Sequence, residues 1–446
     1  MHSLNKHVLS HMVYKVLLLF IIITLLEVYI ASFWTNITSV HWIRGKKQKW
    51  SSIRQRQSSY EPYLSDPVII SPELQAELNR RLLNATDEKI ILIYISGFGV
   101  EDRKWVDKKK CGNCEITYDR KLINDERTGA VVFHYDRLGV MNVPWKRNPR
   151  HLYVLWTMES TLTMLAIGNL QVKFMEYFKF NATLTYRRDS DFQAQYGNSD
   201  TVASIIKTNN LTLKEIYKRK KKVAVAVVSD CDYTPGAVVR LKQLKELSDY
   251  GFGLECYGSC FGGKIFTDKP FTGFNGFISE YKFYFSFENS YHCRDYITEK
   301  FFVNGLKSLA VPVVWGPRIE EYMAVSPPGS FIHADSFASL KELADYIKYL
   351  DKNETAYLEY FRWLYMDPKD LPQYGKTSDW CQLCRALHGI NIDELYNPLY
   401  NESKIPIFTN GVAPRTVDDT IDWLYGREYT ECVDPFWDLN WDSRLI

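Results

Sequence analysis

Short apolar segments of strand length recur along most of this chain, and helix-spaced apolar positions lie between several of them. The strand-length segments are residues 90–95, 130–134, 152–156, 222–229, 254–256, 281–287 and 311–315. Helical spacing is clearest after residue 229, at Val239, Leu241, Leu244 and Leu247, and again in residues 340–350. This alternation of strands and helices predicts an α/β protein with parallel sheets.

The clearest unit is the stretch 281–317. Residues 281–287 form an aromatic strand, the polar triplet 288–290 breaks it, and residues 311–315 form a second strand that is apolar on both faces. Between them, a helix is predicted to begin at Asp295 as N-cap and to present Thr298, Phe302, Leu306 and Leu309 on one face. The N-terminus of the helix in such a βαβ unit is a common phosphate-binding position.

Glu299 and Lys300 fall in the first turn of this predicted helix, and the spacing alone allows two interpretations. An exposed ion pair on a helix surface is the commoner arrangement. Alternatively, the carboxylate could bind a ribose diol and the ammonium a phosphate.

The N-terminal region is typical of a membrane-anchored protein. Residues 16–34 form an apolar run close to the length of a membrane span, interrupted by Glu27. A signal anchor is favoured over a cleaved signal peptide, because the run is long and no small-residue cleavage site follows it. The flanking charges favour a cytoplasmic C-terminal side, since Lys6 and Lys15 precede the run and four basic residues follow it at Arg44, Lys46, Lys47 and Lys49.

Glycosylation sequons and cysteines favour the opposite topology, with the C-terminal side in the secretory lumen. Asn-x-Ser/Thr triplets begin at Asn36, which lies very near the predicted membrane span, and at Asn84, Asn181, Asn210, Asn353 and Asn401. The chain has nine cysteines, including paired motifs at Cys111/Cys114 and Cys381/Cys384. These motifs could form a four-cysteine zinc site in a cytosolic protein, or disulfides in the lumen.

The string FENS…DYITEK…VPVVWGP, within residues 287–317, resembles the signature of the α1,3-fucosyltransferases of glycosyltransferase family 10. The resemblance covers roughly residues 90–387. It implies a glycosyltransferase B fold of two facing Rossmann-like α/β domains, and it implies that Asn289, Tyr296, Glu299 and Lys300 contact the donor, GDP-fucose. It also implies disulfides linking the Cys111/Cys114 region to the Cys381/Cys384 region, in an order that the sequence leaves open.

Two further site residues follow from the same resemblance. Glu159 comes directly after a predicted strand, where open α/β sheets place their chemistry, and it matches the family's Glu-Ser-Pro and its general base. Here Thr161 stands in place of Pro. The family's diphosphate-binding Arg is assigned to Arg240 by counting back from Leu247, which requires a loop three residues longer; counting forward from Ser229 reaches Ala237 instead.

A metal site is not expected. Two short DxD triplets, Asp189-Ser190-Asp191 and Asp230-Cys231-Asp232, resemble the metal–diphosphate clamp of another glycosyltransferase fold, but this pattern is common by chance. The implied fold requires no metal or other cofactor, and stimulation by Mn²⁺ or Mg²⁺ is left open.

The predicted organisation is a cytoplasmic tail (1–15), a transmembrane helix (16–34), a stem (35–88), an acceptor-side domain (89–219), a GDP-fucose-binding domain (220–390) and a C-terminal segment of unassigned role (391–446). Residues 197–219 are predicted to cross between the domains without clear periodicity. Residues 412–446 allow three interpretations: a helix returning to the first domain, a surface tail or an acceptor-side element.

The predicted function is that of a Golgi type II membrane enzyme with a luminal catalytic domain. It would transfer fucose from GDP-β-L-fucose, with inversion, to the 3-hydroxyl of GlcNAc in a glycoprotein or glycolipid glycan. The alternative is a catalytically silent Golgi protein of the same fold that binds glycans or nucleotides. The net charge of +2 gives no reason to expect nucleic-acid binding.

Overall fold

The computed structural model describes residues 72–97, 106–139, 143–144, 146–167, 174–175, 177–263, 273–372, 379–390, 417, 420–425 and 432. All of them belong to one compact unit, Tyr60–Ile446. None of the helices within these ranges is both long and apolar enough to cross a membrane. The predicted tail, the predicted span at 16–34 and most of the stem lie outside the described residues.

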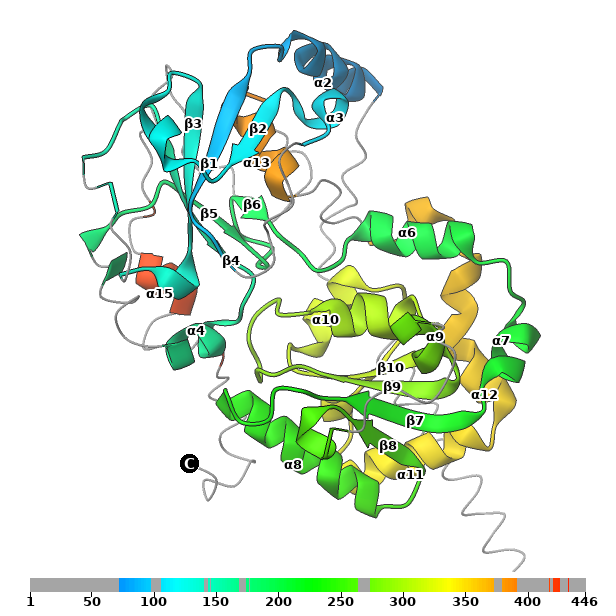
Figure 1. The fold of residues 1–446 in the computed structure, drawn as a ribbon. Coiled ribbons are helices and arrows are strands. Elements are labelled where there is room, and N and C mark those ends of the chain that lie inside the picture. The colour runs from blue at the N-terminus through cyan, green and yellow to red at the C-terminus, as the bar shows by residue number, and fades with distance from the viewer. Residues whose placement is uncertain are drawn as a thin grey trace, which may run out of the picture. The chain divides into compact units, whose positions relative to one another are not determined.

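Two parallel sheets form the framework, which confirms the predicted α/β class (Figure 1). The first sheet has the strand order β2-β1-β3-β4-β5-β6. Its strands are β1 (Lys89–Ile95), β2 (Cys114–Thr117), β3 (Thr128–His134), β4 (Leu152–Thr157), β5 (Ala182–Thr185) and β6 (Phe192–Gln193). The second sheet has the order β11-β10-β9-β7-β8. Its strands are β7 (Lys222–Val227), β8 (Leu254–Tyr257), β9 (Tyr281–Phe287), β10 (Val311–Trp315) and β11 (Ile332–His333).

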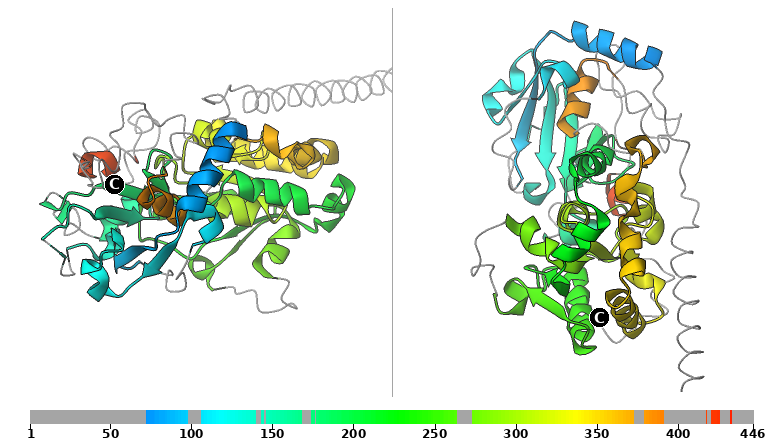
Figure 2. Two further views of the ribbon diagram at one scale, coloured as in Figure 1. Left: turned by 90° about the horizontal axis from the view of Figure 1, so that it is seen from above. Right: turned by 90° about the vertical axis from the view of Figure 1, so that its right-hand side faces the viewer.

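The connecting segments are largely helical, as parallel strand pairing requires. The described α-helices are α2 (Pro72–Asn84), α3 (Lys108–Cys111), α4 (Thr161–Ile167), α6 (Ser199–Thr208), α7 (Leu213–Arg219), α8 (Pro235–Asp249), α9 (Gly273–Ser279), α10 (Ile319–Val325), α11 (Leu340–Asp351), α12 (Glu354–Leu358), α13 (Asp379–Leu387) and α15 (Thr420–Tyr425). A seven-residue π-helix, η4 (Lys300–Leu306), connects β9 to β10. Figure 2 shows the same elements from two further directions.

The segment 197–219, whose sequence has no clear periodicity, contains two helices, α6 and α7. Both helices begin with capping boxes that satisfy the first backbone N–H groups. Asn198 pairs with Thr201 at the start of α6, and Thr212 pairs with Glu215 at the start of α7. Only Ser199, Val202 and Ile205 of α6 are buried, so its apolar stripe is too short to stand out in a polar stretch.

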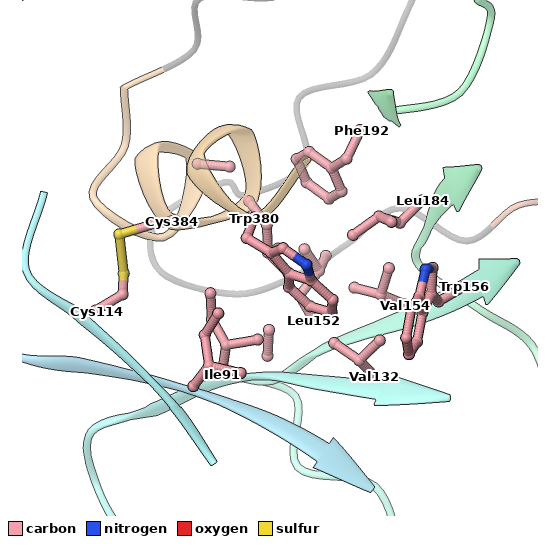
Figure 3. Packing of buried hydrophobic residues seen from close by; sticks show 14 of the residues in the cluster. Ile91, Cys114, Val132, Leu152, Val154, Trp156, Leu184, Phe192, Trp380 and Cys384 are labelled. Carbon is pink, nitrogen blue, oxygen red and sulfur yellow. A yellow bond between two sulfur atoms is a disulfide. The ribbon is translucent and has the colours of Figure 1, made fainter. Parts of the chain in front are cut away.

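The core of the first sheet includes a helix from far along the chain (Figure 3). Trp380 of α13 packs edge-on against Trp156 of β4, with ring centroids 5.3 Å apart. Leu383 of the same helix is also fully buried in this cluster. Although α13 falls within the predicted second domain (220–390), it therefore packs as part of the first.

Two disulfides hold this arrangement: Cys111 is bonded to Cys381 and Cys114 to Cys384. The disulfide interpretation of the paired motifs is thus confirmed, and the structure leaves no free thiol at these positions for zinc. It adds the pairs Cys231–Cys260 and Cys293–Cys432 and leaves Cys256 as the free cysteine.

The C-terminal part returns to the first sheet through α15. Leu424 is fully buried in the core that contains Phe133 and Tyr153. The backbone N–H of Val417 donates to the carbonyl of Phe180 at 2.8 Å. Of the three interpretations of residues 412–446, a helix that returns to the first domain is confirmed for α15.

Candidate active site

Glu159 lies just after β4, at the carboxyl end of a central strand of the first sheet. Its backbone N–H donates to the hydroxyl oxygen of Thr157 at 3.1 Å. Its carboxylate accepts a hydrogen bond from the hydroxyl of Tyr296 at 3.2 Å. Since Tyr296 follows β9 of the second sheet, this bond joins the predicted base to a predicted donor-binding residue.

A cavity of about 300 Å³ adjoins Glu159 and Asn289. Asn289 is the second residue after β9, so residues next to both sheets line this space. The remaining lining residues are His134, Tyr135, Asp136, Thr157, Thr163, Met164 and Tyr233. The cavity has the size of a small-ligand pocket, and it brings polar, aromatic and ionisable groups together.

Tyr296 is almost completely buried, and burial raises the pKa of its hydroxyl well above 10. The hydroxyl therefore stays protonated at neutral pH and can act as a hydrogen-bond donor. Its ring packs edge-on against Tyr186, with centroids 5.0 Å apart, and against Tyr196 at 6.4 Å. These contacts fix the direction in which the hydroxyl points toward Glu159.

The helix was wrongly predicted to begin at Asp295. It begins instead at Lys300, as the π-helix η4. Asp295 adopts a left-handed conformation with φ 59°, which a helix N-cap does not. Its carboxylate accepts from the backbone N–H of Arg188 at 3.0 Å and from Nε of Arg188 at 2.6 Å. Asp295 thus forms an ion pair with the first domain and provides no helix terminus for phosphate.

Glu288 binds the segment just before η4 but does not cap this helix, since the N-cap residue is Glu299. It is completely buried, and its carboxylate accepts from the backbone N–H and the hydroxyl of Thr298, both at 2.9 Å. Lys300 Nζ lies 3.2 Å from the same carboxylate. Burial raises the pKa of Glu288, while the nearby ammonium of Lys300 favours its charged form.

Lys300 is a mostly buried cation with fixed partners. Its ammonium donates to the Thr298 hydroxyl at 2.9 Å and to Glu299 Oε1 at 3.2 Å. Burial acts to lower the pKa of Lys300, but the carboxylates of Glu288 and Glu299 outweigh it, so the pKa is raised. Glu299 is the more accessible partner, with 47% of its side chain exposed. The arrangement places a permanent positive charge beside an accessible carboxylate.

Arg240 lies on α8 and is also buried. Its guanidinium donates to the carbonyl of Phe287 at 3.2 Å and to that of Asp230 at 2.6 Å. Its buried Nε has no hydrogen-bond partner among the described residues. Burial lowers the pKa of Arg240, against the attraction of Asp230 and Glu288. The alternative position, Ala237, is fully buried and apolar, and it cannot bind a diphosphate through a side chain.

Asn289 and Arg240 meet through Asp230, which the sequence indicated only as part of a DxD triplet. The side-chain amide of Asn289 donates to Asp230 Oδ2 at 3.3 Å, and the carbonyl of Asp230 accepts from Arg240. Glu288 and Thr298 are further site residues that sequence reasoning missed. The only signal for Glu288 in the sequence was its position directly after the aromatic strand 281–287, every residue of which is buried in the structure.

The DxD triplet at Asp189–Asp191 is engaged in structural contacts. Asp189 forms an ion pair with Arg187 at 2.7 Å. Asp191 is buried and accepts from the backbone N–H of Thr183 at 2.8 Å. These carboxylates stabilise the turn after β5 and do not converge on an open site.

One predicted glycosylation site, Asn181, is buried in the structure. Asn181 is 4% exposed, and its side-chain oxygen accepts from Arg147 at 2.7 Å and from the backbone N–H of Tyr153 at 2.9 Å. A glycan on this side chain has no room in the folded protein. Asn84 and Asn210 are exposed, and Asn353 is half-buried at the start of α12. Asn36 and Asn401 lie outside the described residues.

Family models match most of the described chain. The model described as "Fucosyltransferase, N-terminal" matches residues 86–197. The model described as "Glycosyltransferase family 10 (fucosyltransferase) C-term" matches residues 217–402. The two matches together cover both sheets.

Curated relatives are also named as fucosyltransferases. Glycoprotein 3-alpha-L-fucosyltransferase A of Drosophila melanogaster is 33% identical over 361 residues, which are 80% of this chain and 66% of the fly protein. The human 4-galactosyl-N-acetylglucosaminide 3-alpha-L-fucosyltransferase 9 is 35% identical over 326 residues, which are 71% of this chain and 82% of the human protein. The chain therefore spans slightly less than two thirds of the fly relative.

Solved structures are more distant. A crystal structure of an α1,3-fucosyltransferase with GDP aligns at a TM-score of 0.42 and 16% identity, covering 74% of this chain and 99% of that one. One with GDP-fucose aligns at a TM-score of 0.37 and 17% identity, covering 74% of this chain and 98% of that one.

Proposed function

We propose that this chain transfers fucose from GDP-fucose to the 3-hydroxyl of GlcNAc in a glycan. The chain belongs to glycosyltransferase family 10, the fucosyltransferases. Its family makes it a glycosyltransferase, and its curated relatives are named as 3-α-L-fucosyltransferases. The observation that carries the proposal is the hydrogen bond from Tyr296 to Glu159 beside the cavity. It joins a carboxylate at the end of β4 to the segment that carries the family's donor signature.

The reaction inverts the configuration at the anomeric carbon of fucose, so a single displacement is sufficient. The GlcNAc 3-hydroxyl attacks this carbon while Glu159 accepts the hydroxyl proton, and the bond to the β-phosphate of GDP breaks. The leaving group carries the negative charge away as GDP. By analogy with glycoside hydrolysis, the transition state has oxocarbenium character, and no covalent enzyme intermediate forms.

The buried cations would stabilise the charge that develops on GDP. Lys300 and Arg240 are held in place before the donor arrives, so little reorganisation is needed during the reaction. The Nε of Arg240, which has no partner among the described residues, would donate to a phosphate oxygen. Asn289 and Tyr296 would position the donor, and the accessible carboxylate of Glu299 would bind a ribose or fucose hydroxyl.

A metal is not required in this scheme, because the cationic side chains stabilise the leaving diphosphate. The occupied carboxylates of Asp189 and Asp191 support this proposal, since they bind Arg187 and Thr183. Stimulation by Mn²⁺ or Mg²⁺ is compatible with it and is checked by assaying turnover with chelator and with added metal.

We further propose that the two sheets belong to a glycosyltransferase B fold, and that the chain is anchored as a type II Golgi membrane protein with its catalytic part in the lumen. The disulfides Cys111–Cys381 and Cys114–Cys384 support a secretory compartment, where such bonds persist. Exposed sequons at Asn84 and Asn210 agree with it.

Replacing Glu159 by Gln tests the proposed chemistry. The variant keeps the shape of the side chain but has no carboxylate to accept a proton, so kcat should fall by about 10²–10⁴. Affinity for GDP, measured by calorimetry, should stay within about twofold. Glu126→Gln, at an exposed position of the same domain, is the matched control and should keep full turnover. Wild-type turnover by Glu159→Gln would refute the assignment of the base.

The same assay separates the enzyme from a silent binding protein. GDP release from GDP-fucose should depend on a GlcNAc-containing acceptor. Binding of GDP without any acceptor-dependent release would refute the proposed function as a whole.

A further inference from the structure

A C-terminal segment outside the range of the family models reaches the candidate active site. The matched range ends at residue 402, and α15 lies beyond it. In Figure 1, α15 lies on the first domain near α4, the helix that follows Glu159. Arg187 of the first domain stacks over the ring of Trp423 at 4.3 Å and donates to the carbonyl of Trp423 at 2.5 Å.

Cys432, a few residues after α15, is buried close to the residues that follow Glu159. It forms a disulfide with Cys293, which precedes Tyr296 by three residues. Cys293, Cys432 and Tyr296 belong to one buried cluster, which also includes Tyr186 and packs against the partly buried Leu162 and Tyr196. The hydroxyl of Thr161, two residues after Glu159, contacts Sγ of Cys432.

The same disulfide therefore touches the chain on both sides of the Tyr296–Glu159 hydrogen bond. Through Cys293 it limits the movement of the loop that carries Tyr296. Through Thr161 it holds the first residue of α4, directly after the turn that presents Glu159. A second contact restrains the same turn, because the hydroxyl of Tyr196 donates to the carbonyl of Met158 at 2.7 Å.

We propose that the Cys293–Cys432 disulfide and the Thr161 hydroxyl form a brace that positions Glu159 for proton transfer. In the family pattern that this turn resembles, a Pro occupies the position of Thr161. This is the first position of α4, where a Pro would pre-set the backbone for a helix. In this chain the contact with Cys432 provides that restraint. The inference rests on the proposed role of Glu159, and Cys293, Cys432 and Thr161 are positioning residues.

A double-mutant cycle tests the brace. The disulfide is removed by Cys293→Ser with Cys432→Ser, once in the wild-type chain and once in the Glu159→Gln chain. In the wild-type background kcat should fall by about 10- to 100-fold, because misplacing a reacting group by about 1 Å can cost 10²-fold. In the Glu159→Gln background the same change should cost less than about twofold, since the group that the brace positions is already lost.

Two additional readouts separate positioning from general loss of structure. The KM for GDP-fucose should stay within about threefold. Thr161→Val should reproduce part of the kcat loss, and Thr161→Ser, which keeps the hydroxyl, should retain turnover.

The matched control removes another disulfide. Cys111→Ser with Cys381→Ser leaves Cys114–Cys384 in place and should lower the midpoint of thermal unfolding without lowering kcat. Equal kcat losses on removing Cys293–Cys432 in both backgrounds, or no loss in either, would overturn the brace. If Glu159→Gln alone retains full turnover, the assignment of the base has failed instead, and the two failures are thus distinguishable.

Discussion

Replacing Lys300 by Ala should damage the protein in two separable ways. Glu288 is completely buried, and Lys300 Nζ lies 3.2 Å from its carboxylate, with 21% of the Lys300 side chain exposed. Removing the ammonium leaves a buried carboxylate whose remaining partner is Thr298. Breaking a buried pair by removing one member costs about 3–5 kcal/mol of unfolding free energy. We expect a loss in this range for Lys300→Ala.

The loss should depend on pH. Burial already raises the pKa of Glu288, and losing the adjacent ammonium raises it further. The folded state then binds a proton that the unfolded state has released, in the window between the unfolded pKa and the higher folded pKa of Glu288. Stability contributed by a raised carboxyl pKa falls as pH rises through this window. Lys300→Ala should therefore be closer to wild-type stability at pH 5 than at pH 8.

The second effect is on the donor. A hydrogen bond from a charged group contributes about 1.5–3 kcal/mol, so losing the contact between Lys300 and phosphate should weaken GDP binding by about 10- to 150-fold. The double variant Lys300→Ala with Glu288→Gln separates the two effects, because it removes the unpaired charge. It should recover at least half of the lost stability and none of the lost affinity.

Chemical denaturation and GDP calorimetry on the single and double variants provide the measurements. Lys341→Ala is the matched control, because Lys341 forms an exposed pair with Asp345 on α11 and should change neither quantity appreciably. Wild-type affinity for GDP in the double variant would show that Lys300 only supports Glu288. Its proposed contact with the donor would then be wrong.

Asp295→Asn should lower the free energy of unfolding by about 1.5–3 kcal/mol, because it removes the charge from the hydrogen bonds to Arg188. Asn tolerates the left-handed backbone at this position, so the substitution adds no backbone strain. A loss no larger than about 0.5 kcal/mol in chemical denaturation would show that the ion pair contributes nothing. His333 is buried, and burial lowers its pKa to about 4 from 6.5. Between these two values the unfolded state binds a proton that the folded state does not. The free energy of unfolding of the wild-type protein should therefore fall by as much as ~3 kcal/mol as pH drops from 6.5 to 4. A pH titration of stability for His333→Gln should lack this component, and parallel curves for the two proteins would contradict the assignment. Mass spectrometry of luminally expressed protein should find glycan on the exposed Asn84 and none on the buried Asn181, and an occupied Asn181 would show that this side chain is accessible during folding.

The sequence indicated the main strands because each is an apolar run that is buried in the sheet. Every residue of β4, β9 and β10 is buried, and such runs are readable without any knowledge of the partners. The strands β2, β5 and β6 have at most four residues, and β2 is buried only at alternate positions. Their positions are determined by pairing with neighbouring strands, β2 with β1, β5 with β4 and β6 with β5, which a local pattern cannot reveal.

The charged residues of the site show the same limit. Asp295 has the right residue type for an N-cap, but its carboxylate is taken by Arg188, which lies 107 positions earlier in the chain. Glu288 was interpreted as part of a polar turn, yet it is buried because Thr298 and Lys300 satisfy its carboxylate. Local propensity therefore predicted a helix start at Asp295 that does not form, because contacts distant in the sequence decided which groups each carboxylate binds.

The hydrogen bond between Tyr296 and Glu159 has a consequence for how the two substrates would act together. Tyr296 belongs to the segment that follows β9, and Glu159 belongs to the turn after β4. Donor binding that shifts Tyr296 would change the hydrogen bond to the base, and hence the direction in which the Glu159 carboxylate points. The buried aromatic contacts of Tyr296 with Tyr186 and Tyr196, together with the Cys293–Cys432 disulfide, limit that movement. The position of the proposed base is therefore set as much by the donor-side loop as by its own strand.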